Sequence, residues 1–184
     1  MILFFIVRKF FKIRMQLQIQ EAIKQHVWFA YRMLKPFDTE INPRIWKDRY
    51  FLGYIQGYEA FLIKFSAPNL SPVEKGSIGV RAMQELVPDN FSDVLELVSD
   101  LYVSKSPAFM RGMQHGGDVA ILMSDKAGPE LLADADVQSV LREAPSASEL
   151  SSTLGMDAPV GQTATAGGLL MQLHLSRHRE QIDW

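Results

Sequence analysis

The segment NPRIWKDRYFLGYIQGYEAFLIKF, residues 42–65, contains the most regular helical pattern in the chain. Its large aromatic residues recur every three or four positions, at Phe51, Tyr54, Tyr58, Phe61 and Phe65. This spacing is typical of a helix that buries one face against other helices. We therefore predict a helix over about 43–65, with its aromatic face in the core.

Helix starts are marked in the same way at three places. Each has a side chain that can cap a helix directly before a proline: Asn42-Pro43, Ser71-Pro72 and Ser106-Pro107. The capping oxygen accepts a backbone N–H that has no partner within the helix, and a proline at the first helical position has no N–H to leave unpaired. Glu74 can complete a capping box with Ser71.

The remaining pattern is also helical. We predict helices over about 16–35, 72–87, 91–104 and 107–123 and a short helical pair within 128–144. IRMQLQIQ, residues 13–20, alternates in a way that also fits a strand, although its Gln, Met and Leu content favours a helix. The connections are short, so neighbouring helices are expected to lie antiparallel. The predicted fold class is all-α, a compact antiparallel bundle of about six to eight helices.

The two ends of the chain differ in composition from this predicted helical domain, residues 15–144. Residues 1–14 form an apolar and basic N-terminal appendage. In residues 145–168, 17 of the 24 positions are Ala, Gly, Ser, Thr or Pro, which predicts a flexible linker. Residues 169–184 are expected to form a C-terminal helix that docks either on the chain's own core or on a partner.

Charge is distributed unevenly between the two parts of the chain. Residues 1–64 carry 11 Lys and Arg against 5 Asp and Glu, and residues 65–184 carry 8 against 16. These opposite charges can attract each other within one fold or across a homodimer. A basic N-terminal region can also attract an anionic partner.

The first fourteen residues leave three interpretations open. MILFFIV is too short to span a bilayer, and it lacks the charge order and cleavage site of a secretory signal. The segment can bind peripherally to a membrane surface, be buried in the fold, or precede a true start at Met15. No other segment is apolar enough to span a membrane. Because the absence of cysteine fits a reducing cytosol, we expect a cytoplasmic protein.

Several kinds of chemistry are excluded by composition and motifs. The chain has no cysteine, so disulfides, zinc–cysteine sites, iron–sulfur clusters and a thiol nucleophile are ruled out. The glycine-rich phosphate loops and the serine hydrolase elbow do not occur in the sequence. We expect no cofactor.

Candidate reactive side chains occur in MRGMQHGGD, residues 110–118. On a helix, Arg111, His115 and Asp118 share one face, and a histidine between an acid and an arginine is a candidate general base. The segment contains no nucleophile, and His115 and Asp118 are only two of the three ligands that a zinc site needs. These three residues are the candidates for a catalytic or small-ligand site.

The same segment has a second interpretation, based on packing. Gly112 and Gly116 are four residues apart, as are Gly53 and Gly57 in the aromatic helix. Small residues at this spacing let two helices approach closely, so the two glycine pairs are candidates for a helix crossing. Alternatively, Gly116 and Gly117 together end one helix, and a second one follows.

His174 and His178 lie four residues apart in the C-terminal helix, a spacing that can bind a metal. However, HLSRHRE lacks the glutamate of the HExxH motif. Basic residues near the end of a helix are also favoured by the helix dipole alone. We therefore expect no metal site.

These observations predict a non-enzymatic interaction or regulatory module that associates with a protein partner or with a second copy of itself. Its expected contact residues are three tyrosines at four-residue steps and apolar residues of the tail: Tyr50, Tyr54, Tyr58, Leu169, Leu170, Leu173 and Trp184. The alternative is a small-ligand-binding protein or an enzyme that uses Arg111, His115 and Asp118. The third hypothesis is membrane-surface or nucleic-acid binding through the basic N-terminal region. Nucleic acid is not favoured, because no helix-turn-helix or aromatic RNA platform is recognisable.

Overall fold

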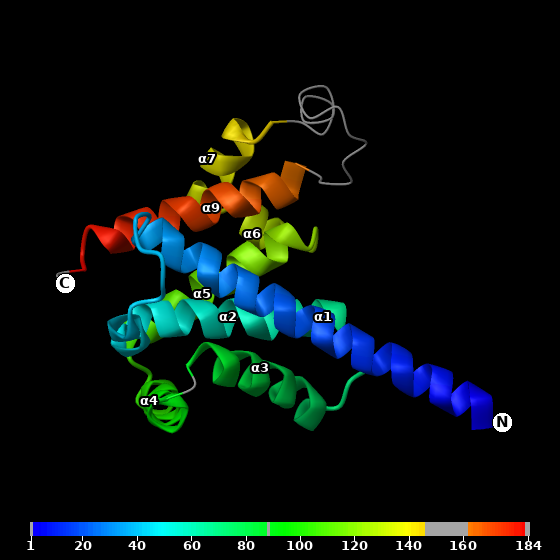
Figure 1. Cartoon of the computed structure of the whole chain (residues 1–184). Coiled ribbons are helices and arrows are strands. Elements are labelled where there is room, and N and C mark those ends of the chain that lie inside the picture. Colours follow the sequence, from blue (N-terminus) through cyan, green and yellow to red (C-terminus); the bar gives the residue numbers. More distant parts are fainter. Residues whose placement is uncertain (1, 88, 146–161, 183–184) are drawn as a thin grey trace.

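A computed structural model describes residues 2–87, 89–145 and 162–182, except for the side chains of residues 2–9. Within these ranges every regular element is a helix, which confirms the predicted all-α multi-helix bundle (Figure 1). The elements are α1 (Ile2–Leu34), the 3₁₀ helix η1 (Pro43–Lys47), α2 (Arg49–Ser66), α3 (Pro72–Leu86), α4 (Phe91–Val103), α5 (Pro107–Met123), α6 (Pro129–Leu132), α7 (Ala135–Glu143) and α9 (Gln162–Arg179).

Helices α2 and α5 form the centre of the bundle, and they share the most extensive contact between any two elements. Helix α1 packs against α2, α3 and α9, while α9 also contacts α5 and α7. Helix α4 lies at the edge of the bundle (Figure 1). The largest fully buried side chains come from several of these helices and include Tyr31, Phe51, Tyr54, Phe109 and Leu170. None of the described helices is long and apolar enough to cross a membrane.

Two of the three predicted helix starts are capped as the sequence indicates. Ser71 Oγ accepts a hydrogen bond from the Glu74 N–H, and the Glu74 carboxylate accepts one from the Ser71 N–H at 2.9 Å, so the capping box is complete. Asn42 Oδ1 accepts from the Arg44 N–H at 3.0 Å. At the third start, Pro107 occupies the first turn of α5, but the Ser106 side chain makes no capping hydrogen bond. The backbone of Ser106 is held by the tight turn after α4 instead, where its N–H donates to Leu101 O.

The helix predicted over 43–65 is divided into two. Asn42 caps only the short helix η1, and Asp48 then adopts an extended backbone conformation with φ −75° and ψ 113°. Its side chain begins α2 by accepting the Phe51 N–H at 2.7 Å. The interruption follows from a second capping residue inside the predicted helix, which the aromatic periodicity conceals.

Helix α1 is continuous from Ile2 to Leu34, so the backbone shows no break between residues 14 and 15. The strand alternative for residues 13–20 is wrong. The physical reason is that the first 34 residues contain neither glycine nor proline, and nothing in them ends a helix once it has begun. Among the described side chains of α1, residues 10–34, the first buried one is Ile19; residues 10–18 are exposed or half-buried, with Met15 packed against the edge of the core.

The C-terminal helix begins at Gln162, seven residues before the predicted position. Residues 146–161 of the predicted linker lie outside the described part of the chain, as does Trp184. The small residues just before 169 are helical because they let α9 pack closely. A Cβ added at Gly167 would lie 2.5 Å from Met123 Cγ. Composition alone does not separate such close packing from a linker.

Glu59 gives the fold a measurable dependence on pH. Its carboxyl lies against Gly79 of α3, and its Oε2 atom is buried without a hydrogen-bond partner among the described residues. Burial raises the pKa of Glu59 from 4.5 to about 7. The folded chain therefore holds a proton between pH 4.5 and 7 that the unfolded chain releases, and stability falls as pH rises through this window.

We expect Glu59→Gln to increase the free energy of unfolding at pH 8 by about 3 kcal/mol and to leave it nearly unchanged at pH 4, because glutamine cannot ionise. Urea unfolding at the two pH values measures this difference. Glu96→Gln, the same change at an exposed position of α4, is the control. A gain of equal size at pH 4 and pH 8 would show that ionisation of Glu59 is not its cause.

Candidate functional site

The close contact between α2 and α5 is made through glycines. A Cβ added at any of four glycines would lie 1.9–2.2 Å from a carbonyl oxygen of the other helix: Gly53 from Phe109, Gly57 from Met113, Gly112 from Tyr50 and Gly116 from Tyr54. The contact positions increase together along both helices, so α2 and α5 run parallel. They are not consecutive in the chain, and the two helices between them provide the return path that a parallel pair needs. Helix α5 also continues through Gly116 and Gly117 without a break.

This contact brings Tyr50 of α2 and His115 of α5 together. Both residues flank the glycine contact, and because the two backbones touch, their side chains emerge close to each other. Tyr50 Oη lies 2.7 Å from His115 Nδ1, and the two rings meet edge to face with centroids 5.7 Å apart. The position of this hydrogen bond is therefore fixed by helix packing.

Helix α9 adds three polar side chains. His174, Arg177 and His178 are three and four residues apart and so share one helix face. His174 stacks on His115 with ring centroids 3.8 Å apart, and His178 packs on Tyr50 at 4.1 Å. The four rings form a continuous row in the order His178, Tyr50, His115, His174.

Two aspartates fix the α9 side chains in place. The Asp48 carboxylate, which also caps α2, accepts a hydrogen bond from His178 Nε2 at 3.0 Å. Asp136 of α7 binds the Arg177 guanidinium through both oxygens, at 2.5 and 3.1 Å. The hydrogen bonds from Arg177 lower the pKa of Asp136, so this pair is ionised at neutral pH.

The central rings are uncharged at neutral pH. Burial, followed by the nearby charge of Arg111, lowers the pKa of His115, and burial followed by the neighbouring His115 lowers the pKa of His174 to about 4. Burial raises the pKa of Tyr50, so this hydroxyl keeps its proton in its hydrogen bond with His115 Nδ1.

Arg111 and two histidine nitrogens have no ionic or hydrogen-bond partner in the described part of the chain. The Arg111 guanidinium lies over the Tyr50 ring, 5.7 Å from its centroid, and no carboxylate of the described residues forms an ion pair with it. His174 Nδ1 and His178 Nδ1 are buried and have no hydrogen-bond partner among the described residues. Buried polar atoms are normally paired, so these two nitrogens are unsatisfied groups in the wall of the site.

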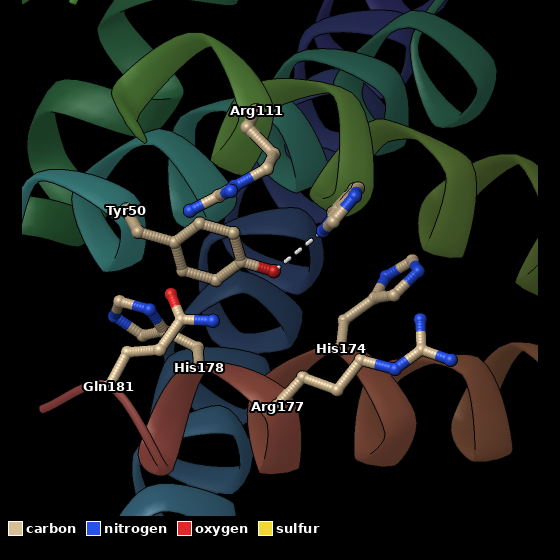
Figure 2. A pocket seen from close by; sticks show the side chains of 7 residues that line it. Tyr50, Arg111, His174, Arg177, His178 and Gln181 are labelled. Carbon is tan, nitrogen blue, oxygen red and sulfur yellow. Dashed lines mark hydrogen bonds between the residues drawn. The ribbon is translucent and has the colours of Figure 1, made fainter. Parts of the chain in front are cut away.

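The side chains surround a pocket of about 210 Å³. It is lined by Tyr50, Arg111, His115, His174, Arg177, His178 and Gln181. Figure 2 shows Arg111 and Tyr50 on one side of this space, opposite the four side chains of the C-terminal segment. The donors of three helices that are far apart in sequence thus converge on one small volume.

Asp118 does not line this pocket, unlike Arg111 and His115. The three residues were predicted to share a helix face, but Asp118 is seven residues from Arg111, which is about 10 Å along the helix axis. Burial, followed by the charge of Asp134, raises the pKa of Asp118 to about 6. The acidic neighbours of the histidines come from other elements instead: Asp48 lies beside His178, and Asp136 lies beside His174.

The residues predicted to contact a partner are mostly covered by the chain itself. Tyr50, Tyr54 and Tyr58 are buried, as is Leu170, while Leu169 and Leu173 are half-buried. The tail therefore docks on the chain's own core. The tyrosine row and the tail helix are not available as free surfaces in this conformation.

His174 and His178 do not point at a common metal position, because each packs on a different ring of α2 or α5. Among the described residues there is no group of three or more His, Asp or Glu side chains that is suited to a metal ion. The spacing of four residues instead serves to place both rings against the pocket wall.

Four pocket or supporting residues were missed by the sequence interpretation: Asp48, Asp136, Arg177 and Gln181. Asp48 directly precedes the aromatic helix, which is a capping position, and this signal is readable. Arg177 lies between the two histidines of HLSRHRE and shares their helix face. Nothing in the sequence indicates that this face meets Arg111.

Comparison of the chain with protein-family models, with curated proteins and with solved structures gave no match. The class defined by the fold is an all-α multi-helix bundle, and the function has to be argued from the pocket itself.

Proposed function

We propose that the protein binds a small oxyanion in the pocket between α2, α5 and α9. The observation that carries this proposal is the Arg111 guanidinium, which borders the pocket beside a tyrosine ring and lacks a carboxylate partner among the described residues. A guanidinium presents several N–H donors in a fixed plane that matches carboxylate, phosphate or sulfate oxygens. The occupant supplies the negative charge that the chain does not.

The surrounding groups support the same class of ligand. A neutral His115 ring carries one N–H and a protonated ring carries two, so this side chain is a second donor that a bound anion favours. Arg177 adds positive charge at the opposite wall, although Asp136 already holds its guanidinium. The hydrogen bonds of His178 to Asp48 and of Arg177 to Asp136 keep these side chains in place before a ligand arrives, which reduces the entropy lost on binding.

The size of the pocket restricts the ligand. A volume of about 210 Å³ is below the range of roughly 300–1,000 Å³ that is usual for drug-sized ligands. It corresponds to roughly seven water molecules at about 30 Å³ each. An inorganic oxyanion or a short-chain carboxylic acid fits this volume, whereas a nucleotide does not.

Sulfate tests the proposal, because its charge stays constant between pH 5.5 and 8. Arg111→Gln is expected to weaken sulfate binding about tenfold or more, since it removes a charge-assisted hydrogen bond worth roughly 1.5–3 kcal/mol. Isothermal titration calorimetry measures the affinity. Arg81→Gln makes the same change on α3, where the side chain is equally exposed and far from the pocket residues in sequence.

The pH dependence provides a second readout of the same titration. A bound anion raises the pKa of His115 and His174, so protons are taken up on binding and sulfate affinity increases as pH falls. If Arg111→Gln and Arg81→Gln bind sulfate with equal affinity, or if the unchanged chain does not bind it, the proposal is wrong.

A further inference from the structure

The N-terminal half of α1 exposes an unusual amount of apolar surface. Residues 10–18, which we call the arm, contain no buried residue. The six exposed positions of the arm are Phe10, Phe11, Ile13, Arg14, Leu17 and Gln18, of which four are apolar and one is basic. Both phenylalanines are about two-thirds exposed, at 65% and 64%. An exposed apolar surface of this kind normally marks a site of contact with a partner.

Helix α4 presents a second apolar surface, which we call the α4 face. Leu95, Tyr102 and Val103 are exposed on it, with Val103 at 78%. They border a shallow, mostly apolar groove of about 420 Å³ that also includes Phe109 and Met113 of α5. The groove is large enough to accept an aromatic side chain.

The arm and helix α4 carry opposite charges, although none of the acidic residues of α4 lines the groove itself. The chain has no acidic residue before Glu21, and the arm adds Arg14, which pairs with no described carboxylate. Helix α4 contains three acidic residues and no Lys or Arg: Asp93, Glu96 and Asp100. Pairing two arms would place like charges together, and so would pairing two α4 faces. Only the arm against the α4 face brings opposite charges into contact.

One chain cannot make this contact with itself. The C-terminal half of α1 is fixed in the core from Ile19 onward, and the helix is continuous. Figure 1 shows the N-terminal end of α1 and helix α4 on opposite sides of the molecule. The arm of one copy can therefore reach only the α4 face of another copy.

We propose that two copies of the chain form a two-fold dimer in which each arm docks on the α4 face of the other copy. The reciprocal arrangement contains the contact twice and closes, whereas a one-way contact would continue into an open series of molecules. Phe10 and Phe11 enter the groove, and the basic arm lies along the acidic helix. This dimer does not use the anion pocket and does not depend on its function.

Size-exclusion chromatography with light scattering across a dilution series tests the proposal on the full chain. The unchanged chain is expected to reach twice the mass of 20.8 kDa. Phe10→Ser/Phe11→Ser and Tyr102→Ser/Val103→Ser should each weaken the dimer about tenfold or more, because each removes two apolar side chains from both contacts. The control is Phe29→Ser/Phe37→Ser, which changes two exposed phenylalanines outside the arm, 55% and 92% exposed. Circular dichroism shows that each variant is folded.

Mixing the two interface variants gives the decisive result. Each is impaired alone, but the mixture contains one intact arm and one intact α4 face in different chains, so a heterodimer should form through one contact. High salt should weaken it, because it is held partly by charge. Three results would each overturn the proposed dimer. The first is a mixture that stays monomeric, and the second is a mass that keeps growing with concentration. The third is an unchanged chain that is monomeric and binds anionic lipid vesicles, when the arm variant alone loses this binding.

Discussion

Gly116→Ala is expected to reduce the free energy of unfolding by about 3 kcal/mol or more, although alanine is the better helix former. The added Cβ would lie 1.9 Å from Tyr54 O, where contacts shorter than 3.0 Å do not occur in practice. Because the clash is with backbone, no side chain can rotate away, and α2 and α5 must separate by about 1 Å along their contact. Urea unfolding measures the loss, and the melting temperature should fall by about 6 °C or more.

The matched control is Gly76→Ala. Gly76 is also helical, but it is exposed, and a Cβ there meets nothing within 4 Å. Only helix propensity changes, and this variant should gain up to about 1 kcal/mol. If Gly116→Ala were as stable as Gly76→Ala, the helices could not cross at the glycines. The same separation would move Tyr50 from His115, so Gly116→Ala should also lose sulfate affinity.

His26 is expected to destabilise the unchanged chain in acid, in the opposite direction to Glu59. The ring is 7% exposed, stacks on Tyr58 with centroids 3.3 Å apart, and has no hydrogen-bond partner for Nε2 among the described residues. Burial lowers the pKa of His26 from 6.5 to about 3. Between these pH values the unfolded chain binds a proton that the folded chain does not, so the contribution of His26 to stability falls by about 1.4 kcal/mol per pH unit as pH falls. Glu59 offsets this contribution down to pH 4.5 but not below it.

The total loss from His26 by pH 3 is about 5 kcal/mol, a large share of the stability of an ordinary domain. His26→Phe keeps a ring stacked on Tyr58 but cannot be protonated, so it should remain folded at a lower pH than the unchanged chain. Acid titration followed by circular dichroism measures the midpoint. Phe29→His adds an exposed imidazole to the same helix and should leave the midpoint unchanged. If His26→Phe unfolds at the same pH as the unchanged chain, groups other than His26 cause the loss of stability in acid.

Much of the fold could be predicted because its signals are local. The proline-marked starts located η1, α3 and α5, and the apolar spacing located α4 and the short pair α6 and α7. Both the cap at Ser71 and the end of α1 near Pro36 depend on interactions within a few residues. The errors arose where one local signal masked another, as at Asp48, or where small residues serve packing, as at Gly167.

The candidate site could be predicted only in part. Arg111 and His115 were recognised as candidates, and their shared helix face follows from their spacing. Their supporting acid was assigned to Asp118 because it is the nearest in sequence, whereas the structure supplies Asp48 and Asp136 from other elements. Periodicity assigns a residue to a face of its own helix, but it does not say which face of another helix lies opposite.

The sequence alone determined that the chain is helical, where most helices begin, and that its two glycine pairs allow a close contact. These properties depend on backbone geometry and on neighbours within about one turn. Only the tertiary structure decided that α2 and α5 run parallel, that α9 returns to cover them, and that four rings and two arginines meet around one pocket. The reason is that contacts between residues 50, 115 and 178 depend on how whole helices pack, which short-range spacing does not encode.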